Sequence, residues 1–364
     1  MENTSPDSDR KSLFSKIVKI VLKCLSVLLL MLIVIVVALC SAMWVLAKGP
    51  SPTAQRLFVM TVKETSAMGF LANMYLPEDE IENIMNPAAQ EDSYIDATDP
   101  SLITITLPPV IPPRQEGSAP SPDEDSIEED DYADIELHDV TGNGYRGYMM
   151  IVRDPKRIFV GTPNTYGGRG LTLMQMVENT GAVAGVNGGG FYDPGGSGSG
   201  GIPDGIVICD GEFRWGAGAG RSSVIGFDSD GILHVGNISA AEARALDIQH
   251  AVSFGPPLIS NGVPQTQRAI SSGINPRTAI GQRADGAVLL LVVDGRQIDS
   301  LGAALTDLIE IFLDFGAVNA ANLDGGSSTL MMLNGEIINT CASVSGPRPL
   351  PSAFLVRALP EGTD

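Results

Sequence analysis

The chain has 364 residues, with 43 acidic and 23 basic side chains and a formal net charge of −20 at pH 7. No basic stripe exists to meet a phosphate backbone, so composition argues against nucleic acid as a partner. The length allows two domains, but the pattern of segments supports one large domain that follows an apolar segment and a spacer.

The first segment is an apolar run preceded by basic residues. No charged residue occurs between Lys23 and Lys48, and the run is rich in Leu, Val and Ile. As a helix, it is long enough to span a bilayer. Five basic residues precede it, so the positive-inside rule predicts a cytoplasmic segment over 1–23: Arg10, Lys11, Lys16, Lys19 and Lys23. We expect a single-pass cell-membrane protein with a transmembrane signal anchor over 24–47 and an extracytoplasmic domain.

Two other interpretations concern how the apolar run is processed. Residues 45–47 can serve as a signal-peptidase site, but cleavable signals have apolar regions of only about 7–15 residues. A lipoprotein signal would need a small residue before Cys40, where the chain has the bulky Leu39. Length favours an uncleaved anchor, and cleavage stays the alternative.

A stalk over 48–112 and a linker over 113–133 follow the anchor. The linker contains Pro and Ser, and Asp and Glu dominate the chain from Glu116 to Asp139. Like charges at this density repel one another, so we expect a disordered, extended tether. Residues 55–85 show helical-looking patches, which predict a small helical unit close to the membrane.

The large domain is predicted over 134–359, with short strands and few helices. A helix is expected over 172–179, with Thr172 as its cap and Gly181 at its end. Residues 238–248 are either a helix or a loop over the site. Apolar runs between Gly and Pro predict strands at 148–152, 158–160, 182–187, 206–209, 223–227 and 232–235. The mixture predicts an α+β fold with a large mixed sheet.

Three apolar strands each end in glycine and an acid. Residues 182–187 run into three glycines, two aromatic residues and Asp193. Residues 288–293 are apolar throughout, as in a strand buried on both faces, and lead to Asp294. A helix-like run at 308–313 precedes a short apolar segment that ends in Asp324 and two glycines. An isolated D-G-G is more often a turn, but three such ends indicate one polar site at a sheet edge.

The order of these motifs resembles that of the phosphodiester glycosidase family. N-G-G-G-F-Y-D at 187–193 and P-R-T-A-I-G at 276–281 come first. V-D-G-R at 293–296, N-L-D-G-G-S-S at 322–328 and the closing R-P-L-P-S-A-F-L-V at 348–356 follow. The resemblance covers residues 134–359, and one glycine before Phe191 departs from the N-G-G-F-F form.

The resemblance implies hydrolysis of a glycosyl-1-phosphodiester at the sugar C1–O bond. Glycoside hydrolysis generally uses two carboxylates around an oxocarbenium-like transition state. Asp324 and Asp294 are the best candidates, with Asp193 third. The departing phosphate monoester is a weak base whose charge must be held. A guanidinium does this with two parallel hydrogen bonds, and Arg277 and Arg296 are the candidates.

Further contacts to the substrate are expected from the glycine-rich turns. Their backbone N–H groups can donate to phosphate oxygens, and Phe191 and Tyr192 either stack on a sugar or pack beneath the loop. The substrate-binding residues expected are Asn187, Gly188, Gly189, Phe191, Arg277, Arg296, Asn322, Gly325, Gly326, Ser327 and Ser328.

No cofactor or protein metal ligand is expected. The three histidines stand in no metal-ligand spacing: His138, His234 and His250. A calcium site with oxygen ligands alone stays an alternative, with the carboxylates of Asp193, Asp204 and Asp324. The sequence leaves open whether Cys209 and Cys341 pair.

The expected substrate is a surface glycopolymer or exopolysaccharide that carries sugar phosphodiesters. One alternative is a non-catalytic glycan-binding module held near the membrane. The other is a phosphodiesterase that breaks the P–O bond, although such enzymes generally use a metal cluster that this sequence lacks. The products distinguish all three: free sugar, no product, or sugar-1-phosphate.

Overall fold

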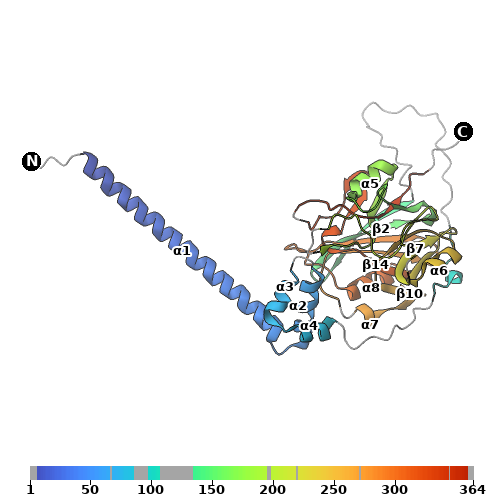
Figure 1. Ribbon diagram of the computed structural model, residues 1–364, viewed down its shortest axis with the longest axis horizontal. Coiled ribbons are helices and arrows are strands. Elements are labelled where there is room, and N and C mark those ends of the chain that lie inside the picture. The colour runs from blue at the N-terminus through green and yellow to red at the C-terminus, as the bar shows by residue number, and fades with distance from the viewer. Residues whose placement is uncertain are drawn as a thin grey trace, which may run out of the picture.

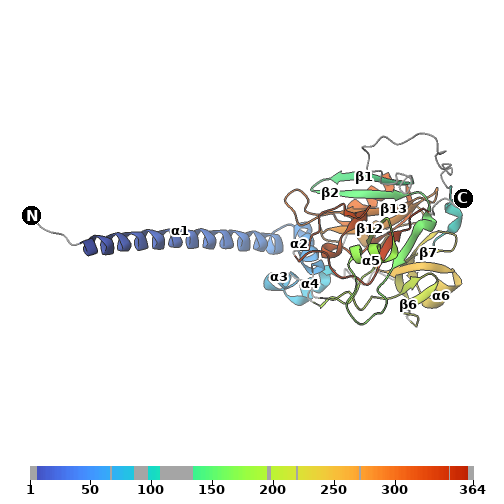
Figure 2. The same cartoon turned by 90° about the horizontal axis from the view of Figure 1, so that it is seen from above.

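The computed structural model describes most of the chain, in the ranges 6–65, 68–85, 97–106, 134–194, 198–218, 220–269, 272–343 and 345–359. A long helix leads to three short helices, which lie beside a large α+β domain (Figures 1 and 2). The α+β class predicted from the sequence is confirmed. The acidic linker over 113–133 lies outside the described residues.

Helix α1 (Pro6–Lys48) is the one helix of the described residues that is long and apolar enough to cross a membrane. After three intervening residues α2 (Pro52–Glu64) begins, with the Ser51 hydroxyl capping it. Helices α3 (Phe70–Tyr75) and α4 (Glu78–Met85) pack against α2 and the end of α1. Their shared core consists of Ala47, Val59, Val62, Ala72, Leu76 and Ile81. The helices expected over 55–85 are therefore present. From here on the name stalk refers to α2–α4 alone, within the longer region 48–112 predicted from the sequence.

The first sheet has seven strands in the order β1-β2-β13-β12-β14-β10-β11. Side chains of β13 are buried at all six positions and alternate between two cores, as its unbroken apolar sequence requires. One face packs on α8 (Leu305–Asp314), and the other packs on the remaining sheets. The strands are β1 (Ile135–Gly142), β2 (Tyr145–Val152), β10 (Pro257–Ser260), β11 (Val263–Pro264), β12 (Arg277–Arg283), β13 (Val288–Val293) and β14 (Ala317–Leu323).

Two five-stranded sheets complete the domain, in the orders β16-β15-β4-β17-β3 and β6-β5-β9-β7-β8. The second sheet contains β3 (Ile158–Gly161), β4 (Ala184–Asn187), β15 (Met331–Leu333), β16 (Glu336–Ile337) and β17 (Ala353–Val356). The third contains β5 (Val207–Cys209), β6 (Glu212–Trp215), β7 (Ser222–Asp228), β8 (Leu233–Ile238) and β9 (Ile248–Ser253).

The strand pairings in all three sheets are antiparallel. The domain thus consists of three antiparallel sheets, where the sequence suggested one large mixed sheet. Tight turns such as Asp210-Gly211, both at positive φ, join neighbouring strands directly, and this connection produces antiparallel pairs.

The helices of the domain are short. Helix α5 (Leu173–Thr180) begins at the Thr172 cap and ends at Gly181 with φ 68°, as predicted. Residues 238–248, which the sequence left as helix or loop, contain α6 (Ala240–Ala245). Helix α7 (Thr266–Ala269) and three 3₁₀ turns, at Pro100–Leu102, Pro155–Arg157 and Gly326–Ser328, complete the elements of the described ranges.

The first sheet brings the ends of β13 and β14 to one edge. Both strands pair antiparallel with β12, so they run in the same direction on its two sides. Arg277 at the start of β12 lies opposite Val293, and its neighbour Thr278 lies opposite Leu323. Asp294 and Asp324 therefore emerge at the same edge.

Candidate functional site

Asn187 joins the second sheet to this edge. Its side chain is fully buried at the end of β4, and its Oδ1 accepts hydrogen bonds from Thr278 Oγ1 at 2.7 Å and Leu330 N at 3.1 Å. Its Nδ2 donates to the Asp324 carbonyl at 2.5 Å. The N-G-G-G-F-Y-D, P-R-T-A-I-G and N-L-D-G-G-S-S motifs therefore meet through Asn187, whose own side chain is committed to the fold.

Gly188 and Gly189 allow close approach of the chain to Ser352. A Cβ on Gly188 would lie 2.9 Å from Ser352 Oγ, and one on Gly189 would lie 2.9 Å from the Ser253 carbonyl. The Gly188 N–H donates to the Ser352 carbonyl, and the Gly189 N–H donates to its hydroxyl, both at 3.1 Å. These N–H groups, proposed from the sequence as phosphate donors, bond to the protein itself.

The second glycine pair packs on the loop before β12. Gly326 has φ 61°, and its N–H donates to the Pro276 carbonyl at 2.8 Å. A Cβ on Gly325 would lie 2.8 Å from that same carbonyl oxygen. Only glycines fit this turn, which holds Asp324 at the end of β14.

Asp193 forms an ion pair with Arg348. The Arg348 Nη2 atom lies 2.8 Å from Asp193 Oδ2, and both side chains are about 15% exposed. The same guanidinium donates through Nη1 to the Ser327 hydroxyl at 3.2 Å and lies 5.0 Å above the Phe191 ring. Asp193 also accepts the Gly198 N–H at 2.5 Å. Arg348 thus connects the N-G-G-G-F-Y-D and D-G-G-S-S motifs.

Asp324 is the carboxyl with the most perturbed acidity at this site. Its pKa is raised to about 6, chiefly by burial and in smaller part by the charge of nearby Asp193. The Ser328 hydroxyl, the Arg348 guanidinium and the Gly325 N–H lower it, but they offset burial only in part. A carboxyl that titrates near neutral pH is suited to proton transfer or charge stabilisation in catalysis.

Asp294 is nearly fully buried, and its carboxylate contacts other groups of the protein. Its Oδ1 accepts hydrogen bonds from Asn339 Nδ2 at 3.2 Å and from Thr340 N at 2.9 Å. Its Oδ2 lies 3.5 Å from Arg146 Nε. The structure thus places this predicted catalytic acid at the expected edge, with its carboxylate holding the loop after β16.

The two predicted phosphate-binding arginines lie side by side near the D-G-G-S-S turn. Arg277 is buried and donates to the carbonyls of Ala303 at 3.1 Å and Gly273 at 2.6 Å. Burial and the charge of Arg277 lower the pKa of Arg296. A Cβ on Gly326 would lie 3.2 Å from Arg296 Nη2, so this guanidinium borders the turn.

The remaining predicted contacts divide into buried and accessible groups. Phe191 is buried beneath Arg348, whereas Tyr192 is 63% exposed and remains free to meet a sugar. Asn322 is buried and donates to the Gly255 carbonyl at 2.9 Å. Ser328 is buried beside Asp324.

Arg348 is the main residue that the sequence analysis missed. It stands in the closing R-P-L-P motif, which was recognised as part of the resemblance, but no role was assigned to it. Its pairing with Asp193 spans 155 positions of the sequence, and no local pattern indicates such a contact. The presence of an arginine inside a family motif was the available signal.

A Cys-His-Asp group occurs at the β5–β6 turn. Among the described residues, Cys209, Asp210 and His250 form a group whose ligand atoms all lie within 4.8 Å of one another. Burial lowers the pKa of His250 to about 4, so its ring is neutral at pH 7. His250 lies 40 positions from Asp210, which is why spacing did not reveal the group.

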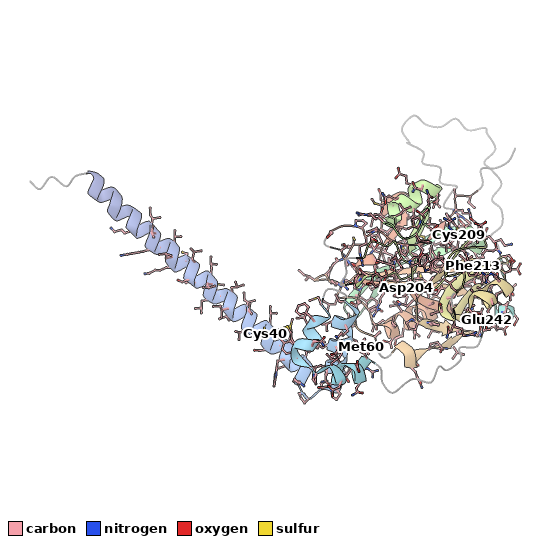
Figure 3. All side chains as sticks on the ribbon, in the orientation of Figure 1. Cys40, Met60, Asp204, Cys209, Phe213 and Glu242 are labelled. Atoms are coloured by element: carbon pink, nitrogen blue, oxygen red, sulfur yellow. The ribbon has the colours of Figure 1, made fainter. Side chains whose placement is uncertain are left out.

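Figure 3 labels Cys209 and also Asp204, whose carboxylate borders Gly190. All four cysteines are free thiols.

Comparison with known proteins agrees with this assembly of motifs. Residues 180–357 match the phosphodiester glycosidase family. The chain is 31% identical over 193 residues to the SPbeta prophage-derived uncharacterized protein YomE of Bacillus subtilis (strain 168), covering 51% of this chain and 29% of YomE. It is 30% identical over 220 residues to the mouse N-acetylglucosamine-1-phosphodiester alpha-N-acetylglucosaminidase, covering 54% of this chain and 41% of that enzyme.

A solved structure shares the fold. It is the catalytic domain of the zebrafish N-acetylglucosamine-1-phosphodiester alpha-N-acetylglucosaminidase, auto-inhibited by pro-peptide, with a TM-score of 0.52 and 24% identity. The alignment covers 62% of this chain and 82% of that domain. The chain spans less than half the length of the curated relatives named above. Residues 180–357 belong to the phosphodiester glycosidase family.

Proposed function

We propose that the chain is an extracytoplasmic hydrolase that cleaves a glycosyl-1-phosphodiester at the sugar C1–O bond. The observation that carries this proposal is the arrangement of Asp324 beside the Asp193–Arg348 ion pair. The family match and the names of the curated relatives support the same reaction class.

Arg348 is our candidate for holding the phosphate. Its guanidinium is charged and planar, and it is held in place by Asp193 and Ser327. A guanidinium donates two parallel hydrogen bonds to phosphate oxygens, so it can stabilise the phosphate monoester as the C1–O bond breaks. Arg296, which borders Gly326, supplies a second positive charge at the turn.

Asp324 is our candidate for the carboxylate that faces the sugar. The phosphate leaving group needs little protonation, so the demanding task is to stabilise positive charge at C1. An ionised Asp324 does this directly or through an activated water. The pKa near 6 leaves the carboxyl largely ionised at pH 7 while keeping it a competent base.

Product analysis tests the proposal. The full chain in detergent is incubated with a soluble N-acetylglucosamine-1-phosphate methyl diester, and the products are separated. We expect free sugar and methyl phosphate. Sugar-1-phosphate would instead show cleavage of the P–O bond, and binding without products would indicate a glycan-binding module.

Matched variants connect the activity to the site. Asp324→Asn should abolish turnover, whereas Asp230→Asn, at an exposed turn between β7 and β8, should not. Equal rates for both variants would remove Asp324 from the mechanism. The natural polymer that carries the phosphodiester is expected to be a surface glycopolymer or exopolysaccharide, reached from the outer face of the cell membrane.

A further inference from the structure

The stalk packs alongside the last turns of α1. The Tyr75 hydroxyl of α3 lies 3.5 Å from the Cys40 carbonyl and 4.0 Å from Met43 Sδ. Cys40 precedes Lys48 by eight residues, which corresponds to about 12 Å along a helix. Figure 3 labels Cys40 on α1 beside the stalk. If α1 spans a bilayer, α3 therefore lies at the depth of its outer interface.

Exposed apolar side chains cluster on α3 and just before it. Met68, Phe70 and Met74 are 46%, 61% and 64% exposed, although Ala72 between them is buried in the stalk core. Trp44 on α1, at the same level, is 57% exposed. Large apolar side chains on one face of a helix, with aromatic residues at the interface, are typical of segments that lie in the membrane surface.

The other side of the stalk contacts the catalytic domain at the site. A Cβ on Gly273 would lie 2.4 Å from Thr61 N, so α2 touches the backbone before β12. The Ile274 N–H donates to the Thr61 hydroxyl at 3.1 Å. Arg296 Nη2 donates to the buried Thr65 hydroxyl at 3.2 Å, and Arg296 borders the Gly326 turn.

Both views place the stalk between α1 and the domain (Figures 1 and 2). The loop that carries Arg296 also exposes Ile298 and Leu301, which are 105% and 60% exposed. Exposed apolar groups thus occur on both partners of the Thr65–Arg296 hydrogen bond, in the stalk and in the Arg296 loop.

We propose that α3 inserts Phe70 and Met74 into the outer leaflet of that membrane and thereby holds the site at its surface. The occupant of this apolar face is the bilayer itself, because only three residues separate α1 from α2. Among the surface glycopolymers expected as substrates, the matching class carries its glycosyl phosphodiester on a lipid of the same membrane. The substrate part of this inference rests on the proposed function.

Membrane contact is tested first, without any substrate. Phe70→Trp and the control Met174→Trp are each made in a background with Trp44→Phe and Trp215→Phe. Met174 is 43% exposed on α5, which lies at the opposite end of the domain from the stalk in Figure 1. In vesicles of lipids brominated near the headgroup, we expect strong quenching of tryptophan at position 70 and none at 174. Equal quenching of the two tryptophans would overturn the membrane contact.

The second arm compares two substrates in the same vesicles. One is the soluble methyl diester of N-acetylglucosamine-1-phosphate, and the other is its dioleoylglycerol diester. We expect Phe70→Ser/Met74→Ser to lower the ratio of anchored to soluble hydrolysis at least about tenfold, because the site is no longer presented to the membrane. Met174→Ser should leave this ratio unchanged. An unchanged ratio in the double variant would overturn the role of α3, and a wild-type chain that hydrolyses only the soluble diester would overturn the substrate class.

The two arms separate the two ideas. If the wild-type chain hydrolyses neither diester, the proposed function fails, and the quenching experiment still decides the membrane contact. Both exchanged side chains are more than half exposed, so their replacement should cost little stability. Circular dichroism checks that the stalk helices persist.

Discussion

Asp324 is placed so that one side chain can govern the pH dependence of the reaction. Burial raises its pKa to about 6, and the ionised form is the one that can stabilise positive charge at C1. We therefore expect kcat/KM to rise with pH to a plateau above about 6, because the free enzyme must lose this proton. A pH–rate profile measures it. A rate that falls above pH 6 would make Asp324 a general acid instead.

The positive charge of Arg348 should set the pH at which kcat/KM rises, which is the acidic limb of the pH–rate profile. Arg348 lowers the pKa of Asp324, so Arg348→Gln should move the acidic limb to higher pH in addition to slowing the reaction. Asp324→Asn should lower kcat by roughly three orders of magnitude or more while the variant remains folded. An Asp324→Asn variant that keeps the limb would show that another group titrates.

Arg348 and Arg277 give a paired test of phosphate binding. Arg348→Lys keeps the charge but loses the planar fork, so we expect kcat/KM to fall about tenfold or more on phosphodiesters. The loss should be smaller for a glycoside whose leaving group is not phosphate. Arg277 bonds to two backbone carbonyls, so Arg277→Lys should slow both substrates equally and lower the melting temperature. A phosphate-selective loss in Arg277→Lys would restore it as the phosphate ligand.

Metal dependence can be decided with the same assay. Arg348 and Arg296 supply positive charge at the site, so we expect activity to survive EDTA. The alternative is a calcium ion held by carboxylates, and the candidate ligands are Asp193, Asp204 and Asp324. Loss of turnover on chelation, with recovery on adding calcium, would establish that alternative.

At the scale of elements, the question for Asp294 is whether it acts in catalysis or stabilises the loop after β16. Its carboxylate holds Asn339 and Thr340 after β16 and faces Arg146. Asp294→Asn should therefore lower both activity and stability, by about 1–3 kcal/mol of unfolding free energy for a mispaired buried group. Thermal unfolding and kinetics are measured together. A loss of several orders of magnitude in turnover with an unchanged melting temperature would make Asp294 the second catalytic carboxylate.

The elements themselves were largely readable from sequence. Strand β13 was visible as an uninterrupted apolar run, and α5 was visible from its Thr172 cap and Gly181 end. These features depend on neighbours in the chain. Asn187 joins two of the predicted strand ends, its own and that of Asp324, and Asp294 emerges at the same sheet edge. The sequence indicated this shared edge because each of these strands ends in glycine and an acid.

The remaining features depend on contacts between distant residues. The division into three antiparallel sheets follows from pairings that periodicity does not specify. The assignment of guanidinium groups required coordinates, because whether Arg277 bonds carbonyls or faces a ligand depends on residues 26 positions away. The hydrogen bond between Thr65 and Arg296 spans 231 positions, and no local pattern in the stalk sequence predicts it.

At the scale of the whole molecule, the orientation of α1 determines which compartment the site occupies. The helix continues from the basic N-terminal segment to Lys48, and its apolar side chains are exposed along most of its length, up to the turns that contact the stalk. Lys and Arg are retained on the cytoplasmic side of such a helix, so the stalk and the catalytic domain should be translocated.

Tag accessibility on intact cells measures this orientation. We expect a C-terminal tag to be reached by antibody from outside, an N-terminal tag to be protected, and the protein to remain in the membrane fraction. Replacing the five basic residues before the apolar run with glutamine should weaken this orientation, because the charge bias that sets it is gone. A soluble form that starts near Lys48 would show a cleaved signal. In that case the stalk would lose Ala47 from its core, and α3 would no longer be held at the membrane by the chain.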